Sequence, residues 1–393
     1  MVDGARGAAL PLIRHDLGLS YAQVGLLASV PLLAGGALEL PLGLLADGGR
    51  RRRLAVLAGG IVFTLSLAAV AEARTFAVLL AACTAFYPAS GAFVSLTQAE
   101  LMDAQPADAR PGRQARVMAR WDLAGSTGAV AGPLLVTAVI AAGSGWRVAY
   151  LVLAALAACA WIATCLRDDQ PARAGPDPPA RARVRDVLAA LRRWRTVRWL
   201  VLLQVADLLV DVLTGFAALY LVDVARLSPA VAALAIAIRL GSALAGDALL
   251  VIVLDRVADL TVLRASAVAA GLLYPGFLLA PGPAAKLAIL AALSAATAPW
   301  YPLLQARLYG SLPGRTPVAV TLSSAAGLAG GIGPLAVGLI AGRFGLSWAL
   351  AGLAVVPVAI LAGVAGVAGA AGAAGAADAA EAAGPAGAGS RGG

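Results

Sequence analysis

Long apolar segments recur along the whole chain, separated by short stretches that are rich in Gly, Pro or Arg. Each segment is close to the ~20 residues that an α-helix needs to cross a bilayer. The pattern therefore predicts eleven membrane-spanning helices, over residues 21–46, 54–71, 75–98, 118–142, 146–166, 198–223, 229–254, 260–280, 286–308, 318–342 and 346–368. Residues 1–14 are also apolar but too few for a full span, which predicts an incomplete first helix.

Composition agrees with a membrane location. Hydrophobic residues make up 61% of the 393 residues and charged residues only 13%, whereas a soluble domain carries about 25% charged residues. Apolar runs of this length exclude an outer-membrane barrel, whose strands alternate apolar and polar residues. The three cysteines, Cys83, Cys159 and Cys165, lie inside apolar runs and form neither a disulfide framework nor a zinc site. The sequence predicts an all-α polytopic membrane protein.

The positions of the basic residues predict the orientation. With residues 1–14 counted as helix 1, twenty-one Arg residues lie after even-numbered helices and six Lys or Arg residues lie in the other loops. Basic residues near span ends favour the cytoplasm. We therefore expect the even-numbered loops and the C-terminus in the cytoplasm, with the protein in the inner (plasma) membrane. The net charge of +9 is explained by these loops, so we expect no nucleic-acid partner.

Two bundles of six helices are predicted from the spacing of the spans. Residues 1–166 form the first bundle, and residues 167–197, rich in Pro and Arg, form a basic cytoplasmic linker. Residues 198–368 form the second bundle, and residues 369–393, nearly all Ala and Gly, are predicted to be a disordered tail.

An internal repeat supports this division. At an offset of 208, Asp3 falls on Asp211 and Ser20 on Ser228, and Gly132-Pro133 recurs further along as Gly333-Pro334. A parallel repeat of two six-helix units is typical of two-bundle transporters. Compared with the second unit, the first lacks half of its first helix, so we expect the true start upstream of Met1, or a truncated product.

The most informative span is the one over residues 198–223. Gln204, Asp207, Asp211 and Thr214 follow one another at spacings of 3, 4 and 3 and share one helix face. Ionisable groups inside a span indicate a functional site, because lipid disfavours them. Two carboxylates one turn apart repel each other when both are ionised, and burial disfavours the ionised form further. This arrangement suits a proton carrier.

Three other charged residues lie inside spans. Arg239 is too costly to leave unpaired in lipid, and a carboxylate of the preceding span is its natural neighbour. Such an ion pair could be released when the carboxylate is protonated, or it could be permanent, and the sequence is compatible with both. Asp247 in the same span and Glu39 in an earlier one complete the candidate proton-coupling group.

Polar stripes also mark a candidate substrate cavity. They occur in the first, fourth and tenth helices, and the seventh adds Gln204 and Thr214. The alternative, that Ser, Thr and Gln only bond helices to each other, stays open at each position. The further cavity candidates are Asp3, Arg6, Thr84, Tyr87, Ser95, Gln98, Ser294, Thr297, Trp300, Tyr301 and Gln305.

A loop between the second and third helices has a recognisable pattern. The segment from Gly43 through Asp47 to Arg51 and Arg52 resembles the signature loop of the major facilitator superfamily, although Gly48 stands where a basic residue is usual. The resemblance implies a gating contact between this loop and the other bundle. Independently, Asp47 ends a helix, where the dipole disfavours an anion, so it needs a compensating partner. A solvated turn with arginines that only set the topology is the alternative.

Further segments carry the same resemblance. Gly128-x-x-x-Gly132-Pro133 resembles the antiporter motif of that superfamily, and Gly145-Trp146-Arg147 resembles a familiar helix start there. The resemblance implies two six-helix bundles around a cavity that helices 1, 4, 7 and 10 line. The small residues also suggest close helix packing, as do their counterparts Gly333 and Pro334.

We therefore expect a secondary active transporter that exchanges protons for a small organic solute, with efflux as the direction. No phosphate-binding loop, metal-ligand cluster or nucleophile triad is present in the sequence, so we expect neither an enzyme nor a cofactor. We expect the chain to act as a monomer. Two alternatives remain: an uncoupled facilitator of a small solute, and a membrane sensor or scaffold that does not transport.

Overall fold

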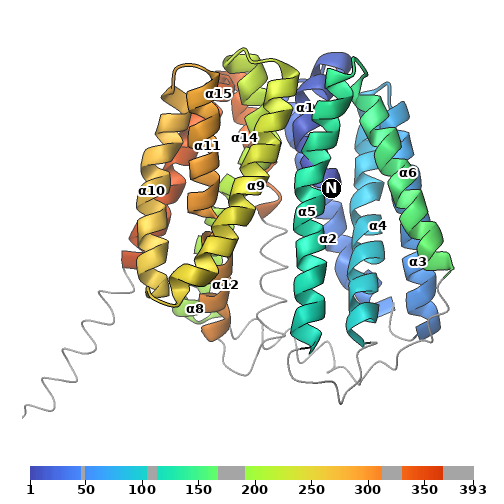
Figure 1. Cartoon of the computed structure of the whole chain (residues 1–393), viewed down its shortest axis with the longest axis horizontal. Coiled ribbons are helices and arrows are strands. Elements are labelled where there is room, and N and C mark those ends of the chain that lie inside the picture. Colours follow the sequence, from blue (N-terminus) through green and yellow to red (C-terminus); the bar gives the residue numbers. More distant parts are fainter. Residues whose placement is uncertain (46–48, 104–112, 167–190, 312–329, 366–393) are drawn as a thin grey trace, which may run out of the picture.

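Two helical bundles lie side by side in the computed structural model, which describes residues 1–45, 49–103, 113–166, 191–311 and 330–365 (Figure 1). Every regular element in these ranges is helical. The N-terminal bundle contains α1 (Val2–Leu17), α2 (Tyr21–Leu45), α3 (Gly49–Glu72), α4 (Phe76–Asp103), α5 (Arg113–Ala141) and α6 (Trp146–Cys165).

The helices of the C-terminal bundle differ widely in length. Its two longest helices are α8 (Trp194–Leu219), which continues into the π-helix η1 (Tyr220–Val224), and α9 (Pro229–Leu254). The others are α10 (Asp259–Leu279), α11 (Pro283–Thr297), α12 (Trp300–Gly310), α14 (Gly333–Phe344), α15 (Leu346–Ala351) and the 3₁₀-helix η2 (Gly352–Ala354), from which helical turns continue to residue 365.

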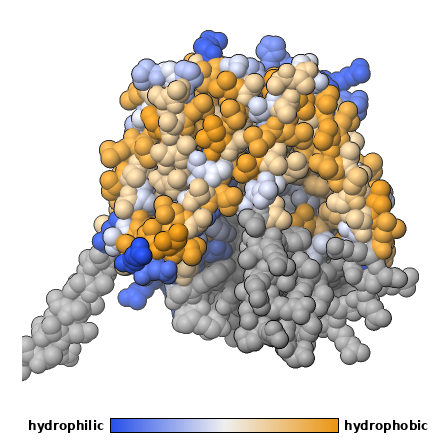
Figure 2. Space-filling model, viewed as in Figure 1, coloured by the Kyte–Doolittle hydropathy of each residue, from blue (hydrophilic) through white to orange (hydrophobic). Residues whose placement is uncertain are grey.

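Ten helical segments within the described ranges are long and apolar enough to cross a membrane, and Gly333–Phe344 is a shorter apolar helix. Figure 2 shows an apolar band across the middle of one face, with hydrophilic residues at its upper edge. Large apolar side chains such as Leu65, Leu272 and Leu279 are exposed on the outside of the bundles, as lipid contact requires. The predicted all-helical membrane fold is confirmed.

Local sequence explains where helices begin and end. Gly18 ends α1 in the left-handed conformation (φ 61°), which glycine adopts without steric cost. Ser228 caps α9 by accepting a hydrogen bond from the Val231 N–H, and Pro229 stands at the first helical position. The predicted span over 286–308 is divided between α11 and α12 at residues 298 and 299, where Pro299 has no N–H to donate to the preceding turn.

The ends of α1, α3 and α6 are held together within the N-terminal bundle. Arg147 forms an ion pair with Asp16 and donates from Nη2 to the Ala73 carbonyl at 2.9 Å. Trp146 Nε1 donates to the same Asp16 carboxylate at 3.3 Å. The Trp-Arg pair that opens α6 therefore fixes one end of this bundle, which we call the α1–α2 loop end.

Close backbone packing joins the two bundles along α2 and α14. A Cβ atom at Gly338 would lie 2.6 Å from the Tyr21 carbonyl oxygen and 2.8 Å from Gly25 Cα. The hydroxyl of Ser29 accepts a hydrogen bond from the Leu335 N–H at 2.9 Å. Glycine at both positions allows the two helices to touch, as small residues do at membrane helix interfaces.

Candidate solute pocket between the bundles

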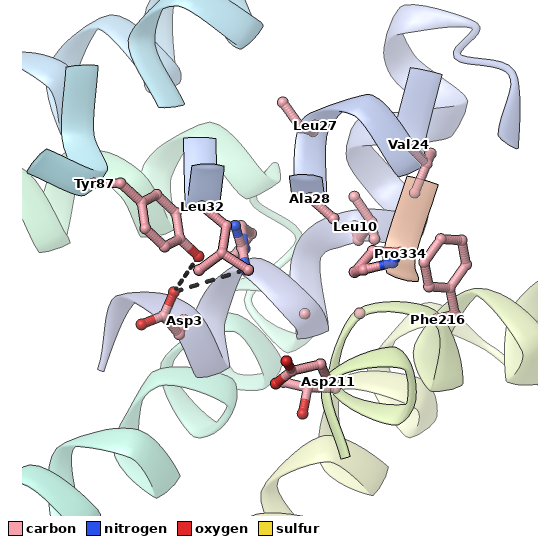
Figure 3. Close-up of a pocket in the computed structure, with 14 residues that line it drawn as sticks. Asp3, Leu10, Val24, Leu27, Ala28, Leu32, Tyr87, Asp211, Phe216 and Pro334 are labelled. Atoms are coloured by element: carbon pink, nitrogen blue, oxygen red, sulfur yellow. Dashed lines mark hydrogen bonds and ion pairs between the residues drawn. The ribbon is translucent and has the colours of Figure 1, made fainter. Parts of the chain in front are cut away.

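A pocket of about 320 Å³ lies between the two bundles (Figure 3). This volume is at the lower end of the range for small-molecule sites. Its walls come from α1, α2 and α4 of one bundle and from α8 and α14 of the other. The lining residues are Asp3, Arg6, Gly7, Leu10, Val24, Leu27, Ala28, Leu32, Tyr87, Asp211, Thr214, Gly215, Phe216 and Pro334.

On one side of the pocket, three residues form a charged cluster. Asp3 accepts a hydrogen bond from the Tyr87 hydroxyl at 3.1 Å and pairs with Arg6 at 3.8 Å (Figure 3). The Arg6 guanidinium lies over the Tyr87 ring, 5.2 Å from its centroid. Its Nη1 is buried without a hydrogen-bond partner among the described residues. The cluster joins α1 to α4 and holds the Arg6 charge against the wall.

Asp211 contributes the second carboxylate, from α8 on the other bundle. It is exposed to the pocket, and Figure 3 shows it apart from the Asp3 cluster. None of the residues that the structure describes forms a hydrogen bond or ion pair with Asp211. Asp207 lies one turn away, half-buried and outside the pocket lining.

Arg239 supplies the positive charge behind this part of α8. It is only 5% exposed, and its Nη2 donates to the Val210 carbonyl at 2.8 Å. Its Nε is buried without a partner in the described part of the chain. The guanidinium is therefore fixed on the backbone of α8, at the residue that precedes Asp211, and it balances the charge of that carboxylate without bonding to it.

Polar contacts join the two bundles at the α1–α2 loop end. Arg14 donates to the Asp223 carboxylate at 2.8 Å, and the Tyr21 hydroxyl donates to the same oxygen at 2.9 Å. The Arg14 guanidinium also lies 4.2 Å from the centroid of the Tyr21 ring. Arg14 and Tyr21 belong to the N-terminal bundle and Asp223 to η1, so these three residues, which we call the latch, connect the bundles.

Backbone contact between α1 and α8 also joins the two bundles. The Thr214 carbonyl oxygen occupies the space that a Cβ atom at Gly7 would need. The Thr214 hydroxyl is turned back to the Val210 carbonyl at 2.7 Å. Gly7 therefore allows the two helices that correspond in the internal repeat to meet beside the pocket.

Five of the predicted cavity and coupling residues thus line the pocket, namely Asp3, Arg6, Tyr87, Asp211 and Thr214. Other predicted cavity residues form hydrogen bonds within their own bundle. Thr84, Ser294 and Thr297 donate to carbonyls one turn earlier in their own helices, and Trp300 is fully buried with its Nε1 on the Ser266 hydroxyl at 3.0 Å. Gln204, Tyr301 and Gln305 also lie outside the pocket lining.

The remaining predicted site residues are placed as follows. Asp247 is exposed on α9. Gly132 packs against the Met1 backbone and Pro133 against Gly4, while Gly128 is close to Met1. Gly333 packs against Leu208, and Pro334 lines the pocket. Asp47 lies outside the described residues, as do the side chains of Glu39, Arg51, Arg52, Ser95 and Gln98 and the surroundings of Gly43.

The latch is absent from the sequence-based prediction. Arg14 and Asp223 each lie at the end of a span, where a charged residue is ordinary. The repeat offers a signal, because at the offset of 208 Asp223 falls on His15, next to Arg14. Opposite charges at the corresponding ends of two related helices can form an ion pair where these ends meet.

The sequence matches the family model of the Major Facilitator Superfamily over residues 1–320. No curated protein matches the chain in sequence. A bacterial homologue of the human lysosomal transporter Spinster, solved in an inward-facing and occupied conformation, superposes with a TM-score of 0.75 at 16% identity, covering 92% of both chains.

Two further solved structures share the fold. The nucleoside transporter NupG superposes with a TM-score of 0.75 at 14% identity, covering 92% of this chain and 94% of its own. A mutant of the peptide transporter POT superposes with a TM-score of 0.73 at 13% identity, covering 92% of this chain and 90% of its own. At these identities the similarity concerns the fold alone.

Proposed function

Because the chain belongs to the Major Facilitator Superfamily, we propose that it is a secondary active transporter that exchanges a small organic solute for protons, in the direction of efflux. The observation that carries this proposal is the pocket, which receives ionisable residues from both bundles. A site at the interface of two repeated bundles can face either side of the membrane in turn when the bundles rock.

The coupling group is proposed to be Asp211 and Asp207, with Arg239 as the fixed counter-charge. Protonation of Asp211 removes the attraction between α8 and the Arg239 side chain of α9. It also neutralises a carboxylate that faces the pocket without a partner in the described ranges. Each protonation state then favours a different arrangement of the bundles, as coupling by differential stability requires. Asp247 and Glu39 remain further candidates for this group.

The orientation inferred from the basic loops assigns each end of the bundles to one side of the membrane. The latch end is proposed to face the outside, so that the described conformation is closed outward. The protein is proposed to lie in the inner membrane, with its C-terminus and its linker in the cytoplasm. The loop with Gly43, Asp47, Arg51 and Arg52 is proposed to form the gating contact on the cytoplasmic side.

Substituting Asp223 with Asn is expected to open the outer end more often. It removes the partner of Arg14, and hydrogen bonds to charged groups contribute roughly 1.5–3 kcal/mol, which corresponds to a shift of about tenfold or more in the population of the two states. A single cysteine at the pocket residue Ala28, in a chain without its three native cysteines, should react faster with an impermeant maleimide added outside.

The matched control is Asp16→Asn, since Asp16 pairs with Arg147 at the same end but within one bundle. This variant loses an ion pair without disconnecting the bundles, so labelling at position 28 should stay near the rate of the parent. Equal labelling rates in the two variants would contradict the role of the latch.

Proton coupling separates this proposal from an uncoupled facilitator. In proteoliposomes, a facilitator moves solute down its own gradient without changing the internal pH. An exchanger moves protons whenever solute moves, and a pH gradient drives the solute uphill. Measuring internal pH and solute content together therefore decides between the two functions.

A further inference from the structure

We propose that the pocket selects small organic cations that carry one positive charge beside an apolar body. This inference rests on the proposed transport function and assigns the class of its solute. Some charged groups of the pocket are already bonded to neighbouring residues, whereas others are accessible to a solute. The accessible groups determine which solutes the pocket favours.

Arg6, the only basic residue among the described lining residues, is poorly available to a solute. The Arg6 side chain is 23% exposed, whereas that of Asp3, its partner, is 67% exposed. Arg6 Nη2 pairs with Asp3, its guanidinium covers the Tyr87 ring, and its Nη1 is buried. A bound anion would have to draw Arg6 away from these contacts, so the cluster disfavours negatively charged solutes.

The acidic residues are more available. Asp211 lines the pocket without a hydrogen bond or ion pair to any described residue, and two thirds of the Asp3 side chain is exposed. The lining residues that the structure describes thus carry two carboxylates and one guanidinium. Arg6 balances Asp3, and the buried Arg239 balances one of the two carboxylates of α8, Asp207 and Asp211. One negative charge of this pair is left, and Asp211 is the member of the pair that lines the pocket. A single positive charge matches this remainder.

Apart from Thr214, whose hydroxyl bonds to its own helix, the rest of the described lining is apolar. Ala28 and Leu32 of the N-terminal bundle are partly exposed, while Leu10, Val24, Leu27 and Phe216, which also line the pocket, are at most 5% exposed. The ring of Tyr87 is covered by Arg6. Apolar surface of this kind favours a hydrocarbon body next to the charge, and the volume of about 320 Å³ limits that body to a small one.

Binding of radiolabelled benzyltrimethylammonium to the full chain in lipid nanodiscs tests the inference without any gradient. This probe keeps its charge at every pH. Unlabelled N,N-dimethylbenzamide and phenylacetate, which are neutral and anionic compounds of similar size, serve as competitors. We expect the labelled cation to bind, and both competitors to displace it at least about tenfold less well than the unlabelled cation, because one charge-assisted contact is worth that factor.

Three variants test whether the cation binds at Asp211. Asp211→Asn should weaken cation binding about tenfold or more, and Asp211→Glu, which keeps the charge, should restore most of it. Glu72→Gln neutralises an exposed carboxylate at the end of α3, outside the pocket lining, and should bind like the parent. Elution of each variant as a single species in gel filtration shows that it is folded.

The outcomes separate the solute class from the transport mechanism. The proposed class is overturned if the cation binds no better than the neutral and anionic probes, or if Asp211→Asn binds it like the parent. Transport of the neutral or anionic probe driven by a pH gradient, without cation binding, would also overturn the class but leave proton coupling intact. Cation binding that depends on Asp211, in a protein that moves no protons, would support the class and refute the coupling.

Discussion

Proteoliposomes that contain the Asp211→Asn variant are expected to accumulate no solute when a pH gradient is imposed. For one proton per solute, a gradient of about two pH units is worth about 2.7 kcal/mol, which supports about 100-fold accumulation by the parent protein. Asparagine cannot take up or release a proton, so the variant should reach a ratio of about one. The measurement is the solute content inside the vesicles at steady state, with the gradient verified by a pH dye.

Two controls make this result specific. Glu72→Gln removes an exposed carboxylate outside the pocket lining and should accumulate solute like the parent. Asp211→Glu keeps an ionisable group at the same place in α8 and should retain accumulation in the same direction. Undiminished accumulation by Asp211→Asn would refute the coupling scheme.

Replacing Gly338 with Leu is expected to slow transport by about fivefold or more. The added side chain would meet the Tyr21 carbonyl and the Gly25 backbone, at 2.6 and 2.8 Å from the Cβ atom alone, and backbone atoms cannot move aside. Overpacking costs roughly 1–3 kcal/mol or more, which would depopulate the state closed at the latch end by about fivefold to more than a hundredfold. Initial rates of solute exchange should fall by a similar factor.

Gly342 provides the matched control on the same helix. It is exposed, and no atom lies within 4 Å of the position of its Cβ, so Gly342→Leu should exchange solute at nearly the parent rate. A cysteine at position 28 should be labelled from outside more rapidly in Gly338→Leu than in Gly342→Leu. Equal rates of exchange and labelling in the two variants would show that close packing of α2 on α14 is not needed for closure.

The helices were largely predictable because lipid imposes length and apolarity on every span. The predicted span over 229–254 coincides with α9 (Pro229–Leu254), where Ser228 and Pro229 also supply a local start signal. The division of the span over 286–308 was not predicted from hydropathy. A run of apolar residues has the same hydropathy whether or not a proline interrupts its backbone hydrogen bonds.

The pocket was only partly predictable. Asp3 and Asp211 stand out because a carboxylate inside a span is rare, and both line the pocket. Ser294 and Thr297 could not be assigned in the same way, since hydroxyl groups can bond to their own helix, and in this structure they do so. The latch depends on how two bundles meet, which is a property of the tertiary structure that the pattern along one helix does not contain.

The central claim is that the carboxylates of α8 exchange protons for solute. The most direct test is to load proteoliposomes with solute, dilute them into solute-free buffer without a pH gradient, and record the internal pH with a trapped dye. We predict that solute efflux acidifies the interior in the parent protein, because protons enter as solute leaves, and that Asp211→Asn produces no such change. Solute efflux from the parent at constant internal pH would contradict the account.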